Sequence, residues 1–264
     1  MKTFGITLSA LLAMVIALPA LAAPTGTVYG NGGQTTGKLR WMNSAKKYVV
    51  TTDKGMSIEY EADDVENVEV DRPKELDAAI KKVKAGSAAS AVSSLETIAK
   101  EYAHLTYDRE ATQWLAEAYL AQGNAGKAVD ACNAIIRTDA EAAYMGPMAT
   151  AYWKALTKNG DTAKLGLLLD KAIASGDATA AAAALVARGN AAMARGTNRV
   201  NCEEALRDGY LRVILLYADS TSDAYAEALY MGAKAFDGMG QGNRANTLRE
   251  KLKSECASSD WARK

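Results

Sequence analysis

Glycine recurs at nearly constant intervals through the last two thirds of the chain, and this spacing constrains the fold more than any other feature. The glycines are Gly86, Gly123, Gly160, Gly196 and Gly240, with steps of 37, 37, 36 and 44 residues. Each lies between two stretches whose apolar residues recur with the 3.6-residue period of a helix. A fixed period of this size indicates stacked helix-turn-helix units that share one core. We therefore expect a mainly α solenoid of about five units over residues 73–257.

Small and large residues alternate inside these units as close helix crossings require. Two units fit this pattern best, through Ala116, Tyr119 and Ala128 in one and Ala233, Phe236 and Ala245 in the other. The unit around Gly160 departs from it, because Trp153 and Leu165 stand where small residues are expected. The unit around Gly196 is expected to have a loop insertion before a second helix over Glu203–Tyr217.

These spacings resemble the tetratricopeptide (TPR) repeat, a 34-residue helix-turn-helix unit. The last third resembles a narrower group, the envelope TPR proteins of bacteria, which include the Tol-Pal-associated periplasmic protein and outer-membrane assembly lipoproteins. The residues that carry this likeness are Glu204-Ala205, Gly209-Tyr210-Leu211-Arg212-Val213, Leu216-Tyr217-Ala218-Asp219-Ser220 and Ala224 to Gly240. The resemblance implies work in envelope assembly or maintenance through protein contacts.

The first 22 residues have the pattern of a secretion signal. Lys2 supplies a positive charge, an apolar run follows over residues 6–18, and Ala20-Leu21-Ala22 gives the small-x-small pattern of a cleavage site after Ala22. The apolar run is too short to span a bilayer of about 30 Å as a helix. We therefore expect an exported, periplasmic or secreted protein with no transmembrane segment after signal removal.

A β-rich segment precedes the helices. Residues 23–37 are rich in glycine and threonine and are expected to form a flexible entry, with one short strand around Thr27–Tyr29. Alternating residues and the turn signal Asp53-Lys54-Gly55 then predict a small antiparallel β domain over residues 38–72, which loosely resembles SH3-like or Sm-like barrels. Residues 258–264 are expected to be a polar tail.

The residues that enzyme sites require are scarce. His104 is the single histidine, so a Ser-His-Asp or Cys-His set would depend on it. Its place near the end of a helix predicts interaction with the helix dipole rather than catalysis. No HExxH or CxxC spacing is present, and we expect neither a metal nor another cofactor. With 31 basic and 31 acidic residues and no basic cluster, binding to nucleic acid is not expected. We expect no enzyme activity.

A binding surface is the stronger expectation. In a TPR superhelix the first helix of each unit lines the concave face, and mixed polar, charged and aromatic residues there suit a peptide or a partner helix. The predicted groove residues are Gln113, Glu117, Thr150, Lys154, Asn190, Tyr230 and Lys234. We expect a scaffold for a protein or peptide partner in the cell envelope. A self-associating structural protein (a homo-oligomer) and an accessory carbohydrate-binding module that uses the β domain remain the alternatives.

Overall fold

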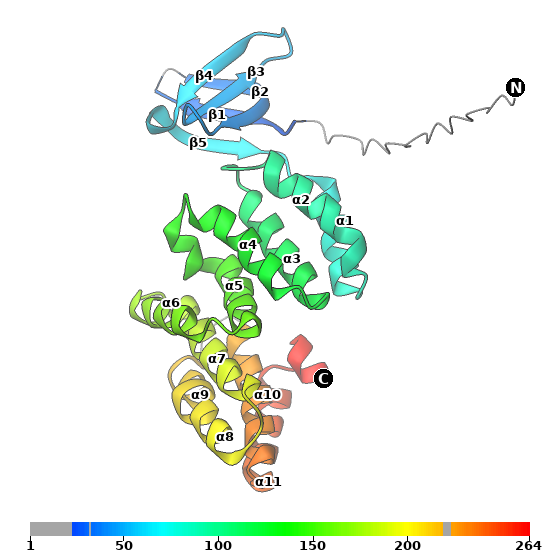
Figure 1. Ribbon diagram of the computed structural model, residues 1–264, viewed down its shortest axis with the longest axis vertical. Helices are drawn as coiled ribbons and strands as arrows, with labels where there is room; N and C mark the ends of the chain where they lie inside the picture. Colours follow the sequence, from blue (N-terminus) through cyan, green and yellow to red (C-terminus); the bar gives the residue numbers. More distant parts are fainter. Residues whose placement is uncertain (1–22, 32, 219–222) are drawn as a thin grey trace, which may run out of the picture.

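The computed structural model describes residues 23–31, 33–218 and 223–264, so the predicted signal peptide over residues 1–22 lies outside the described residues. Figure 1 shows two parts: an antiparallel sheet at one end, and pairs of helices stacked along the long axis away from it. The expectation of a mainly helical protein of paired helices, preceded by a small antiparallel sheet, is confirmed.

Five strands form the sheet. They are β1 (Thr25–Gly30), β2 (Gly33–Met42), β3 (Lys47–Thr51), β4 (Ser57–Glu61) and β5 (Val65–Val70). Consecutive strands pair from β1 to β4, and β5 pairs with β1, so the order is β4-β3-β2-β1-β5 with every pair antiparallel. A 3-10 turn, η1 (Ala62–Asp64), leads from β4 into β5. Val28, Leu39 and Val50 form the buried centre of the sheet.

The structure differs from the expected flexible entry over residues 23–37. All of β1 and the first half of β2 lie there, paired strand to strand. The glycines that suggested flexibility serve close strand packing instead. A Cβ at Gly26 would clash with the carbonyl oxygen of Glu69 in β5, and one at Gly37 would clash with that of Thr51 in β3. Glycine lets neighbouring backbones approach at these two positions.

The helices follow from Lys74 onward. They are α1 (Lys74–Lys84), α2 (Val92–Glu101), α3 (Asp108–Ala121), α4 (Ala125–Ile136), α5 (Gly146–Asn159), α6 (Thr162–Ala174), α7 (Ala178–Ala194), α8 (Arg199–Ala205), α9 (Leu211–Leu216), α10 (Asp223–Gly238) and α11 (Gly242–Glu255). Short 3-10 turns, η2 (Ala88–Ala91) and η3 (Ala140–Ala143), lie between helices. No helix in the described part of the chain is long and apolar enough to cross a bilayer.

The five periodic glycines end the first helices, as their spacing predicts. All five have positive φ, from 72° at Gly240 to 124° at Gly196. Glycine adopts this left-handed conformation without the steric cost that a Cβ imposes. At the end of α5, for example, Gly160 has φ 82° and its N–H bonds to carbonyls of the last helical turn. The chain can therefore reverse into α6 within a few residues.

The fourth helix pair differs from the expected one, in which a loop insertion preceded the second helix. Its second helix begins at Arg199, four residues before the predicted start, because the side chain of Asn198 caps it by accepting a 3.0 Å hydrogen bond from Asn201 N–H. The helix then continues through α8, a π-helical turn η4 (Leu206–Tyr210) and α9. Part of the extra length between Gly196 and Gly240 therefore lies within this second helix, because a π turn contains one more residue than an α turn.

Two glycines bring α7 and η4 into close contact. A Cβ on Gly209 would lie 2.8 Å from the Cα of Gly189, and one on Gly189 would lie 2.5 Å from the Tyr210 ring. Side chains larger than hydrogen would push the two helices apart. The close crossing lets the Tyr210 side chain, which is fully buried, pass beneath α7.

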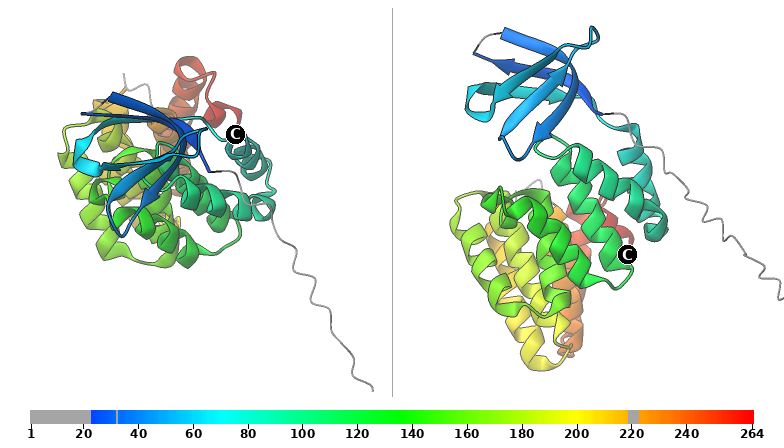
Figure 2. Two further views of the ribbon diagram at one scale, coloured as in Figure 1. Left: turned by 90° about the horizontal axis from the view of Figure 1, so that it is seen from above. Right: turned by 45° about the horizontal axis from the view of Figure 1, so that its top comes forward.

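The pairs stack in one direction, as Figures 1 and 2 show. Each first helix contacts the next one, in the series α1, α3, α5, α7 and α10. Each second helix packs against its own first helix and against the first helix of the following pair. The first helices therefore form a continuous row, and the side chains on its outer side form one surface.

Buried side chains of the described residues gather into two hydrophobic clusters. The larger one runs from Val28 in the sheet to Ala172 in α6 and includes Ala184 of α7. The smaller one runs from Ala182 of α7 to Leu252 of α11. The alanine-rich α7 therefore contributes to both clusters and joins them.

The residues after α11 turn back onto α10. A 3-10 turn, η5 (Asp260–Arg263), contacts both α10 and α11. The expectation of a polar tail over residues 258–264 misses this contact, because Trp261 and Ala262 pack against the smaller hydrophobic cluster.

Candidate partner-binding surface

The seven predicted groove residues lie on α3, α5, α7 and α10, the row of first helices. None is buried: Lys154 and Lys234 are exposed and the other five are half-buried. We refer to the outer side of these four helices as the first-helix surface. It consists of the seven predicted residues together with Glu227.

Glu117 and Lys154 join two neighbouring first helices. The ammonium nitrogen of Lys154 on α5 lies 2.6 Å from Oε1 of Glu117 on α3. The two residues are 37 positions apart, one repeat of the sequence. The side chain of Lys154 is 55% exposed and that of Glu117 is 24% exposed, so water screens the pair and its contribution to stability is at most about 1 kcal/mol. Both charges remain available to a partner.

A second pair, also 37 positions apart, joins α7 to α10. The Nδ2 of Asn190 donates a 2.8 Å hydrogen bond to Oε1 of Glu227, and Tyr210 OH donates one of 2.8 Å to Oδ1 of Asn190. Burial raises the pKa of Glu227, while the bond from Asn190 and the charges of Lys154 and Lys264 act in the opposite direction. A half-buried carboxyl therefore lies where α7 meets α10 on the first-helix surface.

Aromatic and cationic side chains gather at Tyr230, farther along α10. The ammonium of Lys234 lies 5.5 Å from the centre of the Tyr230 ring, within cation–π range. The Trp261 ring lies 5.4 Å from the same ring at an interplanar angle of 44°. Lys264 lies over the Trp261 ring at 3.4 Å. We call Tyr230, Lys234, Trp261 and Lys264 the Tyr230 cluster.

Gln113 and Thr150 belong neither to the two pairs nor to the Tyr230 cluster. Thr150 donates a 2.7 Å hydrogen bond from Oγ1 to the carbonyl of Pro147 in its own helix. Both residues are half-buried on the first-helix surface. The structure thus brings together Glu117 with Lys154, and Tyr230 with Lys234, but leaves Gln113 and Thr150 as separate positions.

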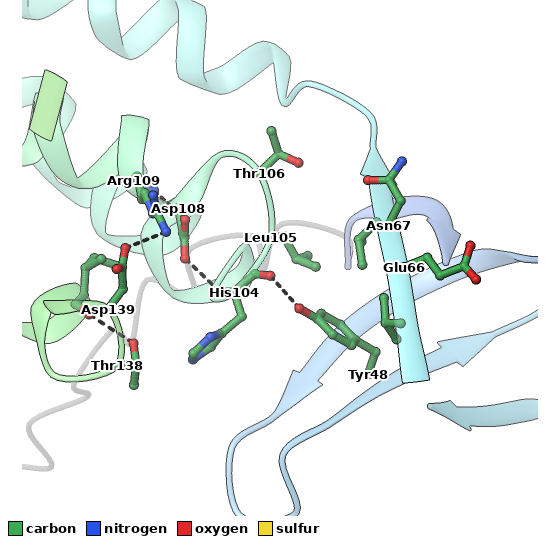
Figure 3. Close-up of a pocket in the computed structure, with 13 residues that line it drawn as sticks. Tyr48, Glu66, Asn67, His104, Leu105, Thr106, Asp108, Arg109, Thr138 and Asp139 are labelled. Atoms are coloured by element: carbon green, nitrogen blue, oxygen red, sulfur yellow. Dashed lines mark hydrogen bonds and ion pairs between the residues drawn. The ribbon is translucent and has the colours of Figure 1, made fainter. Parts of the chain in front are cut away.

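A cavity of about 620 Å³ lies between the sheet and the helices, lined from β3, β5, the α2–α3 loop and the region after α4. Figure 3 shows how it is built. Asp108 accepts a 2.8 Å hydrogen bond from the backbone N–H of His104, and Arg109 forms a 2.5 Å ion pair with Asp139. Tyr48 OH donates a 3.3 Å hydrogen bond to the carbonyl of His104.

His104 is positioned by these contacts and by its own backbone. It lies just beyond the end of α2 with φ 61°, a left-handed conformation that is uncommon for residues other than glycine. Its ring packs against Trp41 of β2. Burial, with a smaller effect of the Lys46 charge, lowers the pKa of His104, so the neutral imidazole is favoured. The favoured neutral form does not carry the positive charge that the expected interaction with the helix dipole would use.

Of these contacts, the Tyr48–His104 hydrogen bond and the packing of the His104 ring against Trp41 join the sheet to the helices. Burial also raises the pKa of Asp108, although two backbone N–H groups bond to its carboxyl. Within the described ranges, no cluster of three or more histidine, cysteine or acidic residues has the arrangement of a metal site. Cys132, Cys202 and Cys256 have free thiols, and burial raises the pKa of Cys132 to about 12.

Sequence reasoning missed Glu227 on the first-helix surface and three residues that lie against it, Tyr210, Trp261 and Lys264. Glu227 and Tyr210 were not expected there, because the step from Gly196 to Gly240 is longer than the others and α7 and α10 do not align position by position. Trp261 and Lys264 were assigned to a polar tail. One signal was available for them: Trp261 is a large apolar side chain in an otherwise polar segment.

The fold and this surface define a protein of stacked helix pairs joined to a small antiparallel sheet. No family model, curated protein or solved structure matches this chain.

Proposed function

We propose that this protein is an exported scaffold that binds a protein or peptide partner in the cell envelope through its first-helix surface. The observation that carries the proposal is the continuous row of first helices, on which Glu117, Lys154, Asn190 and Tyr230 remain accessible. A partner helix or extended peptide laid along such a row would meet charged, amide and aromatic groups in turn. Export to the periplasm rests on the signal pattern of residues 1–22.

We further propose that the helical part is a TPR-type solenoid. Its support is the repeated arrangement: a turn glycine with positive φ in each pair, and contacts between successive first helices. For the sheet we propose an SH3-like or Sm-like fold. The order β4-β3-β2-β1-β5 and the 3-10 turn before the last strand support this assignment.

The proposal is tested by crosslinking and pulldown of the tagged, exported protein from its native envelope. The variant Glu117→Gln/Lys154→Gln/Lys234→Gln removes three charges from the first-helix surface. The control Asp130→Asn/Lys171→Gln/Lys253→Gln removes the same numbers of acidic and basic charges from exposed positions on the second helices α4, α6 and α11. Thermal unfolding checks that both variants fold.

We expect wild type and the control to recover one envelope partner in stoichiometric amount, and the first-helix variant to lose most of it. Equal recovery by both variants would place binding elsewhere. Recovery of the protein alone, without another partner, would favour the second candidate, a self-associating envelope protein.

Exposed apolar side chains favour this second candidate. Leu215 and Leu216 in α9 are 77% and 65% exposed, and Val200 in α8 is 71% exposed. Leu215 and Leu216 are neighbours in the chain, and contiguous exposed apolar side chains are typical of association surfaces, whereas single ones are ordinary. Light scattering of the mature protein measures its mass directly, and a monomer would remove this candidate.

The aromatic side chains that a carbohydrate site would use are half-buried, and each already makes a contact within the protein. Trp41 and Tyr48 contact the His104 region, Tyr60 shares a 2.5 Å hydrogen bond with Thr35, and Tyr29 OH bonds to Glu69. For this reason we do not propose a carbohydrate-binding module.

A further inference from the structure

The segment of residues 259–264 lies on the first-helix surface, where the proposed function places a partner. Trp261 stacks near Tyr230 and is half-buried, and Lys264 reaches both rings, at 3.4 Å from the centre of Trp261 and 6.0 Å from that of Tyr230. Tyr230 and Lys234 are two of the residues predicted to bind a partner. Residues 259–264 therefore already cover this end of the surface.

The segment is held by side chains rather than by backbone pairing. Its backbone hydrogen bonds run within residues 256–264, from Ser259 N–H to the Cys256 carbonyl, from Ala262 to Ser259 and from Lys264 to Trp261. The hydroxyl of Ser259 caps the turn by accepting from Trp261 N–H at 3.2 Å. Contact with α10 consists of ring stacking and cation–π attraction. Another segment with the same side chains could make the same contacts.

The charge on the surface matches the charge on the segment. Burial raises the pKa of Glu227, and the positive charges of Lys154 and Lys264 partly offset this rise. The Glu227 carboxyl is half-buried and accepts a 2.8 Å hydrogen bond from Asn190 of α7. An incoming peptide with an aromatic residue followed by a lysine or arginine would satisfy the Tyr230 ring and the Glu227 carboxyl together.

We propose that the α7–α10 end of the first-helix surface is a site for a short peptide in which a basic residue follows an aromatic one, and that residues 259–264 occupy this site until a partner displaces them. The proposal rests on the proposed function, because it specifies the chemistry of the partner and a means of regulating its access. A tethered segment competes at an effective concentration on the order of millimolar, so a partner of moderate affinity binds more weakly while the segment is bound.

The test uses a fluorescein-labelled peptide of residues 257–264, Ala-Ser-Ser-Asp-Trp-Ala-Arg-Lys, added to the full-length mature protein. Fluorescence anisotropy measures its binding to wild type and to the Trp261→Ala variant, whose own segment lacks the stacking ring. We expect the variant to bind the peptide at least about tenfold more tightly than wild type does. A peptide with alanine in place of the tryptophan should not bind.

A second substitution locates the binding site. Adding Tyr230→Ala to the Trp261→Ala variant should abolish peptide binding, whereas adding Tyr29→Ala, in the sheet at the other end of the molecule, should leave it unchanged. No binding to the Trp261→Ala variant at millimolar peptide would overturn the proposal, as would equal binding to wild type. The envelope pulldown is independent: partner recovery without peptide binding would keep the scaffold function and reject this inference.

Discussion

The imidazole ring of His104 packs against the indole of Trp41, with ring centroids 4.5 Å apart, and this contact joins the sheet to the helices. Burial lowers the pKa of His104. The unfolded chain, with an ordinary histidine pKa of about 6.5, therefore takes up a proton more readily than the folded protein as the pH falls. Stability should decrease as the pH falls below about 6.5, through the lowered pKa.

Because His104 is the only histidine, a tag-free sample gives a single histidine titration by NMR. We expect its midpoint below 6.5, and a higher midpoint in the Trp41→Ala variant, in which the ring is less buried. A wild-type midpoint at or above 6.5 would contradict the burial described for this contact.

Asp108 should be a strong determinant of stability. Its carboxyl accepts hydrogen bonds from the backbone N–H groups of His104 at 2.8 Å and Arg109 at 2.6 Å, and the residue is 8% exposed. Asp108→Ala leaves both donors without this partner and should lower the free energy of unfolding by about 1–3 kcal/mol. Asp108→Asn keeps an acceptor oxygen and should cost less. Urea denaturation measures both, and equal losses would show that these bonds do not carry the effect.

Two helical glycines should respond in opposite ways to alanine. At Gly209 a Cβ would lie 2.8 Å from the backbone of Gly189 and from the Leu185 carbonyl oxygen, so Gly209→Ala should destabilise by about 1–3 kcal/mol through overpacking. At Gly166 in α6 no atom lies within 4 Å of an added Cβ. Gly166→Ala should stabilise by up to about 1 kcal/mol through helix propensity. Thermal unfolding distinguishes them, and a neutral Gly209→Ala would show that the crossing tolerates a wider spacing.

Glu227 should make stability depend on pH in the opposite direction from His104. Burial raises its pKa in the folded protein, so between the ordinary glutamate value and the raised one the folded state binds more protons than the unfolded state. The contribution of Glu227 to the free energy of unfolding therefore decreases as the pH rises from the ordinary glutamate pKa through the raised one. Glu227→Gln keeps an acceptor for Asn190 and removes the charge, and should stabilise by roughly 1 kcal/mol near pH 7.

The control for this prediction is Glu250→Gln, at an exposed position on α11. Urea denaturation at pH 5 and pH 7.5 should show a smaller loss between the two pH values for Glu227→Gln than for wild type or the control. An identical pH dependence in all three proteins would mean that Glu227 does not carry it.

The parts of the fold that local rules determine could be predicted from the sequence. Gly86, Gly123 and Gly160 mark turns because the left-handed conformation there excludes most other residues, and this constraint needs no knowledge of the tertiary structure. For the glycines of β1 and β2, local rules alone led to a wrong prediction. Gly26 and Gly37 look like flexible linkers locally, and only their pairing with β5 and β3 shows why a side chain is excluded.

The positions of residues on the row of first helices could be predicted as far as the repeat is regular, and their binding of a partner stays a prediction. Glu117 and Lys154 occupy corresponding positions on α3 and α5, as the repeat implies, and the structure shows an ion pair between them. Beyond Gly196 the repeat lengthens, and a π turn and an offset of α10 bring Tyr210 and Glu227 to Asn190. The return of Trp261 onto Tyr230 is a tertiary contact that no periodic pattern encodes.

The division of buried side chains at α7 has a consequence for how this protein loses its structure. Because α7 is the helix that contributes buried side chains to both clusters of the described chain, the half from α8 to α11 can melt while the sheet and the helices α1 to α6 stay packed. Heating should then produce two separate transitions instead of one. A pulling force applied along the stack would release the α8–α11 half as one step and leave the rest able to serve as a template on which it re-forms.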